Sequence, residues 1–173
     1  LLFLRNEDSR AERHFERALT LNPNDADVAA MFANILVYWG RWREALDWMA
    51  TAKRLNPFPP NLYHWYHALA LYSGRQYQAA IEALQGARSL HSWSLGLRAA
   101  CHARLGMRAA ARSDIDQFVR ERHRELREND EPVPADDLDL AATRAERYRH
   151  AADRKHFLYG LRKAGLGTTR IAS

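Results

Sequence analysis

Apolar residues in the first two thirds of the chain recur at a fixed distance. One run leads to Leu21-Asn22-Pro23 and returns 34 residues later, ending at Leu55-Asn56-Pro57; its apolar members are Ala11, Phe15 and Ala18, then Ala45, Met49 and Ala52. Spacings of four and then three positions place these residues on one face of a helix. Fixed self-similarity over 20 to 50 residues is typical of an array of stacked helical units.

Each unit is expected to be two helices joined by a tight turn. Gly40, Gly74 and Gly106 follow the first helix of a unit and are expected to take positive φ, while Pro23 and Pro57 end the second helix. Two weaker copies follow, carried by Ala80, Leu84 and Ala87, and then by Leu105-Gly106, Ala111, Ile115 and Phe118. The pattern predicts units at about 1–25, 26–59, 60–91 and 92–124.

This pattern resembles the tetratricopeptide repeat (TPR), whose 34-residue unit carries a small residue, a large apolar residue, a small residue and a late proline. Ala11, Phe15, Ala18 and Pro23 match all four positions. The resemblance covers residues 1–124 and implies an all-α solenoid of helical hairpins with a carboxy-terminal helical extension. It further implies a protein-binding or scaffold function rather than an enzyme.

In the TPR family the first helix of each unit lines a concave groove that binds a partner protein or peptide. Carried over to this chain, the resemblance points to Asn34, Tyr38, His64, Tyr72 and Arg104. Aromatic residues and arginine are common among binding hot spots. Tyr38 and Tyr72 have an equal alternative, which is packing between helices. Only Asn34 matches the clamp with which some TPR proteins hold a terminal carboxylate, so that clamp is not expected.

A narrower resemblance links the chain to the carboxy-terminal repeat regions of bacterial multidomain signalling proteins, such as those with a class III adenylate or guanylate cyclase domain. It is carried by Leu55-Asn56-Pro57-Phe58, by 62–66 and by 160–166. It implies a regulatory region of a larger cytoplasmic protein, with no cyclase chemistry in these residues. Because Leu1 to Arg5 falls where the first helix of a unit should end, we expect further chain before it.

The residues after the repeats change in character. Acidic residues gather around Pro132 and Pro134 without a basic residue among them, which predicts a linker at 125–137. A modest apolar stripe then predicts helices in 138–173. Repeat arrays need a cover for the exposed face of their last unit, so this tail is expected to cap the array. The alternative is that the tail lies in the groove as an internal competitor.

Composition and cysteine content limit the environment of the protein. The chain of 173 residues is 47% hydrophobic and 27% charged, as in ordinary globular domains, and its apolar runs fall short of the roughly 20 residues that cross a bilayer. No membrane partner is expected. A single cysteine, Cys101, excludes an intramolecular disulfide and is expected to be buried, which fits a reducing cytoplasm.

Other classes of function were weighed against the same residues. The net charge of +5 and an arginine-rich fourth unit could serve nucleic acid, but arginines on helices more often form a solvated face, and an acidic protein segment is the favoured guest. No enzyme motif, catalytic residue or cofactor site is found. His64 and His67 lack a third metal ligand. The alternative to partner binding is a homo-oligomerisation module, joined through Trp39, Trp42, Trp48 or Tyr77.

Overall fold

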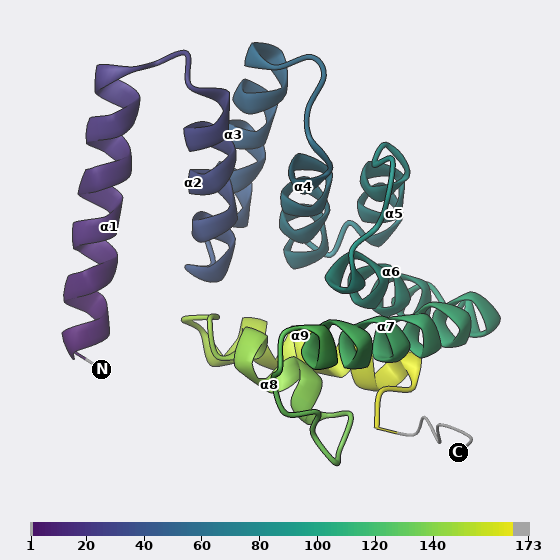
Figure 1. The fold of residues 1–173 in the computed structure, drawn as a ribbon. Helices are drawn as coiled ribbons and strands as arrows, with labels where there is room; N and C mark the ends of the chain where they lie inside the picture. Colours follow the sequence, from purple (N-terminus) through teal and green to yellow (C-terminus); the bar gives the residue numbers. More distant parts are fainter. Residues whose placement is uncertain (1, 168–173) are drawn as a thin grey trace.

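The computed structural model describes residues 2–167, with side chains from Arg10 onward, and all regular structure in this range is helical (Figure 1). The helices are α1 Leu2–Leu21, α2 Ala26–Tyr38, α3 Trp42–Leu55, α4 Asn61–Ser73, α5 Tyr77–Gln85, α6 Ser92–Arg104, α7 Arg108–Glu128, α8 Asp139–Ala145 and α9 Ala151–Ala164. The predicted all-α fold of helical hairpins is confirmed. No helix in the described range is long and apolar enough to span a membrane.

Three hairpins, α2–α3, α4–α5 and α6–α7, follow one another along the array, and α1 stands beside α2 (Figure 1). The repeated alanines allow close approach, because Ala45, Ala52 and Ala80 are fully buried. Helix α1 packs against α2 through Phe15, whose ring stacks on the ring of Phe32 with centroids 5.2 Å apart. Helix α1 is continuous from Leu2, so the helix end expected near the start of the chain is not seen in residues 2–5.

The turn glycines follow the prediction at two of three positions. Gly40 and Gly106 both have φ of 80°, as expected for a residue that reverses the chain after a first helix. Gly74 does not, because it stands one position earlier in its turn, and the next residue, Arg75, takes φ of 63° in its place. Gly74 is needed for a different reason: a Cβ there would lie 2.7 Å from the Trp42 ring.

The two tail helices fold back onto the array. Helix α9 packs mainly against α6, contacts α7 and α8, and also reaches α4 (Figure 1). The segment between α7 and α8 is fixed at its end, where His123 of α7 lies 3.1 Å from the Asp137 carboxylate. The tail therefore covers the last hairpin and extends over earlier first helices as well.

Candidate functional site

The first helices of the three hairpins, α2, α4 and α6, share one side of the array, which we call the inner face. The tail lies on this face where these helices end. The backbone N–H of Arg149 donates to the carbonyl of Tyr38 over 2.8 Å, and the hydroxyl of Tyr72 donates to the carbonyl of His156 over 3.1 Å. The inner face thus has a covered end, at the carboxy-terminal ends of its helices, and an open remainder.

Two of the five predicted site residues, Tyr38 and Tyr72, are buried at the covered end. Tyr72 is 0% exposed, and its ring packs against His156, with centroids 4.8 Å apart, and against Phe157. Tyr38 is 6% exposed and meets the edge of the Tyr148 ring at 5.1 Å. Both tyrosines therefore pack within the chain, against its own tail.

Arg104 is the third predicted site residue at the covered end. Its Nε donates to the Tyr77 hydroxyl over 3.0 Å, and its guanidinium lies 5.2 Å from the centroid of the Tyr159 ring of α9. An arginine over an aromatic face is attracted by the ring quadrupole. Arg104 thus holds the tail helix to the end of α6.

One residue explains how closely the tail approaches. A Cβ at Gly160 of α9 would lie 2.1 Å from the Tyr72 hydroxyl oxygen and 2.9 Å from the Ala100 Cβ. Only a glycine at position 160 allows α9 to approach Tyr72 of α4 and Ala100 of α6 this closely. The covered end is therefore a close-packed contact in which any added atom must displace a buried side chain.

The open part of the inner face contains a pocket of about 360 Å³, which we call the open pocket. It lies between the middle of α2 and the amino-terminal turns of α4 and α6, and the end of α8 closes one side. Its lining residues are Asn34, Leu62, Trp65, Tyr66, His91, Ser92, Trp93, Glu125, Arg144 and Arg147. Of the five predicted site residues, only Asn34 lines it, and its Oδ1 is buried without a hydrogen-bond partner among the described residues.

An adjoining pocket of about 340 Å³ shares Trp93, Arg144 and Arg147 with the open pocket. It extends toward the segment after α7 and contains Glu131 and Asp139. The two pockets meet at these three shared residues. Arginine side chains and a tryptophan therefore stand at the boundary between them.

Arg144 lines both pockets and is not among the residues predicted from the sequence. Its guanidinium lies 4.2 Å from the Trp93 ring centroid and 5.3 Å from that of Trp65, and Nη1 donates to the Tyr38 hydroxyl over 3.0 Å. A signal was present: Arg144 stands four residues after the buried Leu140 and three after the buried Ala141, on the apolar side of α8. A cation on a buried helical face needs a specific partner.

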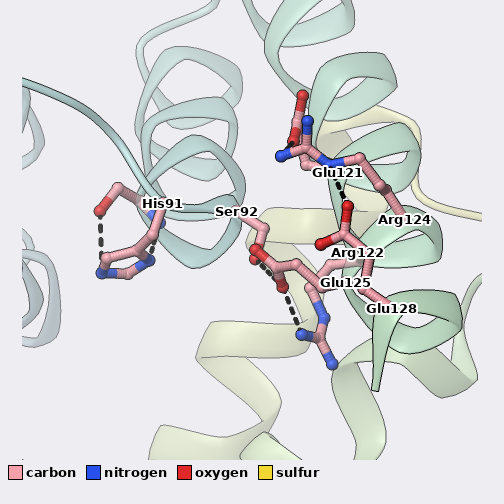
Figure 2. A network of polar contacts seen from close by, with 8 residues as sticks. His91, Ser92, Glu121, Arg122, Arg124, Glu125 and Glu128 are labelled. Atoms are coloured by element: carbon pink, nitrogen blue, oxygen red, sulfur yellow. Dashed lines mark hydrogen bonds and ion pairs between the residues drawn. The ribbon is translucent and has the colours of Figure 1, made fainter. Parts of the chain in front are cut away.

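The acidic wall of the open pocket is already engaged. Glu125 of α7 accepts from the Ser92 hydroxyl over 2.8 Å and pairs with Arg122 over 2.6 Å (Figure 2). Figure 2 also shows Arg124 between Glu121 and Glu128 on the same helix. Because Glu125 has these two partners, it does not neutralise Arg144.

The histidines considered for a metal site face different helices. Nδ1 of His64 lies 3.0 Å from the Ala83 carbonyl of α5, and Nδ1 of His67 lies 2.6 Å from Nζ of Lys53 of α3. Burial, followed by the nearby Lys53 charge, lowers the pKa of His67 to about 4, so it is neutral near pH 7. Within residues 2–167 no group of three His, Cys, Asp or Glu side chains could hold a metal ion.

Cys101 is fully buried, as expected, and burial raises the pKa of its thiol, which keeps it protonated and unreactive.

Several arginines of the fourth unit are paired. Arg98 forms two hydrogen bonds, of 2.9 and 2.6 Å, with the carboxylate of Asp114, and Arg112 pairs with Asp116. Arginines held by carboxylates offer little to a phosphate backbone.

No protein-family model and no curated protein matches the chain. Among solved structures, it is similar to the crystal structure of YrrB, described as "a TPR protein with an unusual peptide-binding site". The superposition covers 95% of this chain and 79% of that chain, with a TM-score of 0.56 and 22% sequence identity. The fold is a TPR-type solenoid. The comparisons give no support to the narrower resemblance to cyclase-associated regions.

Proposed function

We propose that this TPR-type solenoid is a scaffold that binds a segment of another protein in the open pocket of its inner face. The observation that supports this most is the buried Oδ1 of Asn34, which has no hydrogen-bond partner among the described residues and belongs to a side chain that lines a pocket with aromatic walls. Buried polar atoms are almost always hydrogen-bonded, so an orphaned one in a hollow is well placed for a partner. The fold similarity to a protein described as having a peptide-binding site supports the same class of function.

In this proposal, aromatic side chains supply apolar contact area and polar side chains supply hydrogen bonds. Tyr66 of α4 supplies rigid area for an apolar partner side chain, with the buried Trp65 behind it, and Asn34 of α2 supplies a hydrogen bond to the partner backbone. Tyr38, Tyr72 and Arg104 hold the tail, and the two tyrosines meet a partner only where the tail is displaced. His64 contributes indirectly, through its contact with α5. No catalytic step is assigned to any of these residues.

A peptide-display selection on the purified chain tests the proposal. A library of random short peptides is selected on the immobilised protein, and the best binders are measured by calorimetry. We expect Asn34→Ala and Tyr66→Ala each to weaken binding by about tenfold, the effect of losing one good contact. The matched control is Arg43→Ala, because Arg43 lies over the Trp42 ring outside the pocket. If no peptide is selected, or if the control weakens binding equally, the proposal fails.

The alternative, homo-oligomerisation, is less well supported by the contacts of its candidate residues. Trp39 is buried, Trp48 packs edge-on against Phe32 with centroids 5.6 Å apart, and Trp42 packs against Gly74. The fourth candidate, Tyr77, meets the rings of Tyr72 and His156. Molar mass by light scattering decides this question, because a monomer stays near 20.0 kDa on dilution and a dimer stays near twice that value.

The wider setting also belongs to the proposal. We place the scaffold in the cytoplasm, as a regulatory region of a larger signalling protein. The buried lone thiol of Cys101 is compatible with a reducing compartment. Immunoblotting of cell fractions with an antibody against the purified chain tests both points, because it reports the size of the whole protein and its compartment.

A further inference from the structure

The open pocket contains a positive charge without a negative partner. Arg144 is half-buried between two indole rings, and its one hydrogen bond is to the neutral hydroxyl of Tyr38. Its Nε is buried without a partner, and no described Asp or Glu forms an ion pair with it. Burial lowers the pKa of the guanidinium, yet arginine stays charged at neutral pH. A desolvated cation of this kind is costly until an anion meets it.

Other arginines of the same region show what Arg144 lacks. Arg98 meets both oxygens of Asp114, and Arg122 is held by Glu125. Arg147, one turn after Arg144, is exposed beside the same pocket, and no side-chain hydrogen bond or ion pair involves it among the described residues. The pocket thus presents two unbalanced positive charges on its α8 side.

We propose that the open pocket recognises the carboxylate of an aspartate or glutamate in the partner segment, with Arg144 as its main contact and Arg147 and Asn34 beside it. This inference rests on the scaffold function proposed above and names the chemistry of its partner. Arginine can bind a carboxylate through two parallel hydrogen bonds. The Trp65 and Trp93 rings hold the guanidinium between them, so little side-chain freedom is lost on binding.

The surroundings favour a single carboxylate over a phosphate group. Glu125 of the open pocket is already paired with Arg122, whereas Glu131 and Asp139 line the adjoining pocket. These carboxylates oppose a second negative charge, because like charges at short range repel. Asn34 can turn its amide N–H toward the bound carboxylate, since the two ends of an amide exchange by rotation.

Pools of short blocked peptides test the inference, each pool having one fixed central residue and random residues elsewhere. The fixed residue is Glu, Gln or phosphoserine, and binding of each pool to the purified chain is measured by fluorescence anisotropy. We expect the Glu pool to bind about tenfold more tightly than the Gln pool, as for one charge-assisted hydrogen-bonded pair. Equal binding of these pools, or a preference for phosphoserine, would overturn the inference.

Two variants locate the effect. Arg147→Gln is at an exposed position and should leave folding unchanged while reducing the Glu preference. Arg144→Lys keeps the charge but lacks the planar fork, so it should lose most, but not all, of the preference of about tenfold. The control is Arg43→Lys, since Arg43 also lies over a tryptophan, 4.3 Å from the Trp42 centroid, but outside the pocket. Circular dichroism checks that each variant is folded.

The outcomes separate this inference from the scaffold proposal. If the Glu and Gln pools bind equally and Asn34→Ala weakens both, the scaffold function stands and the acidic preference is wrong. If no pool binds, both proposals fail. If Arg147→Gln and Arg144→Lys keep the full Glu preference, the carboxylate is bound elsewhere and the assignment to Arg144 is overturned.

Discussion

The two parts of the inner face use similar residues for different purposes. At the covered end, Tyr38 and Tyr72 are buried by the tail, and their hydroxyls are hydrogen-bonded within the chain. In the open pocket, Asn34 and Arg144 have buried polar atoms without partners among the described residues, as do Tyr148 and His156 at the covered end. The two regions differ in that the orphaned residues of the open pocket line a hollow that a partner can enter, whereas those of the covered end lie in close-packed contacts with Tyr38 and Tyr72.

The position of a residue within a repeat therefore does not determine whether its side chain is exposed. Tyr38 and Tyr72 are 34 residues apart and both lie in the last turn of a first helix, where a groove contact is expected. A tail outside the repeats covers both. The predictions below test whether the covered end is structural and the open pocket is not.

The largest expected effect is at the centre of the covered end. Tyr72→Ala should lower the free energy of unfolding by about 3–5 kcal/mol, because it leaves a cavity where a fully buried ring meets Tyr77, His156 and Phe157. Urea denaturation measures the loss. Tyr72→Phe, the matched control, should cost only about 1 kcal/mol, because it removes only the hydrogen bond to His156. A loss below about 0.5 kcal/mol for Tyr72→Ala, typical of surface positions, would place Tyr72 outside the core.

The next effect concerns how closely the tail packs. Gly160→Ala should cost about 1–3 kcal/mol through overpacking, although alanine is the better helix former by about 1 kcal/mol. The reason is the 2.1 Å approach of a new Cβ to the Tyr72 hydroxyl. Hydrogen exchange should show faster opening of α9. Gly96→Ala of α6 is the control, because its nearest atom is a Phe118 ring carbon at 3.0 Å, and its cost should be smaller. Equal costs would argue against a special contact at Gly160.

A smaller effect should appear with pH at the same end. Burial, followed by the charges of Arg104 and Arg75, lowers the pKa of His156 below its ordinary value of 6.5, while Asp153 acts in the opposite direction. Below pH 6.5 the unfolded chain therefore binds a proton that the folded chain resists, so stability falls as pH falls. His156 is only half-buried, so we expect its part to be below about 1 kcal/mol.

The difference between wild type and His156→Gln isolates this residue from the other histidines. Unfolding free energies are measured from pH 7.5 to pH 5. The wild type should lose more stability on acidification than the variant. If the free energies of unfolding of wild type and variant fall equally with pH, His156 stays accessible to protons. Helix α9 is then held less tightly than the contacts with Tyr72 and Tyr77 indicate.

The hairpins could be predicted from the sequence because their determinants are local. Apolar spacing and turn residues lie within one repeat, and helix periodicity follows from them. The error at Gly74 was local too: the connection before α4 is one residue longer than the one before α2, so Gly74 falls one position early in its turn and Arg75 takes the positive φ. The fold class therefore needed no knowledge of the tail.

The site could be predicted only in part, because its determinants are distant in sequence. The hydrogen-bond partners of Tyr38 and Tyr72 lie 106 and 84 residues away, at Arg144 and His156. These tail positions have no counterpart in the repeats, so the period says nothing about them. Asn34 was singled out because it belongs to a repeat, and Arg144 was not singled out because it lies outside the repeats.

The smallest effect on stability is expected at Asn34. Its substitution is the sharpest test of the difference between the covered end and the open pocket. Its Oδ1 is buried without a partner, so removing the amide relieves a desolvation cost instead of breaking a bond. Asn34→Ala should therefore change the free energy of unfolding by less than about 0.5 kcal/mol, or raise it, in urea denaturation. The same variant should weaken peptide binding. If Asn34→Ala instead lowers the free energy of unfolding by about 1 kcal/mol or more, as loss of a satisfied hydrogen bond does, the amide stabilises the fold. The open pocket would then have a structural role, like the covered end.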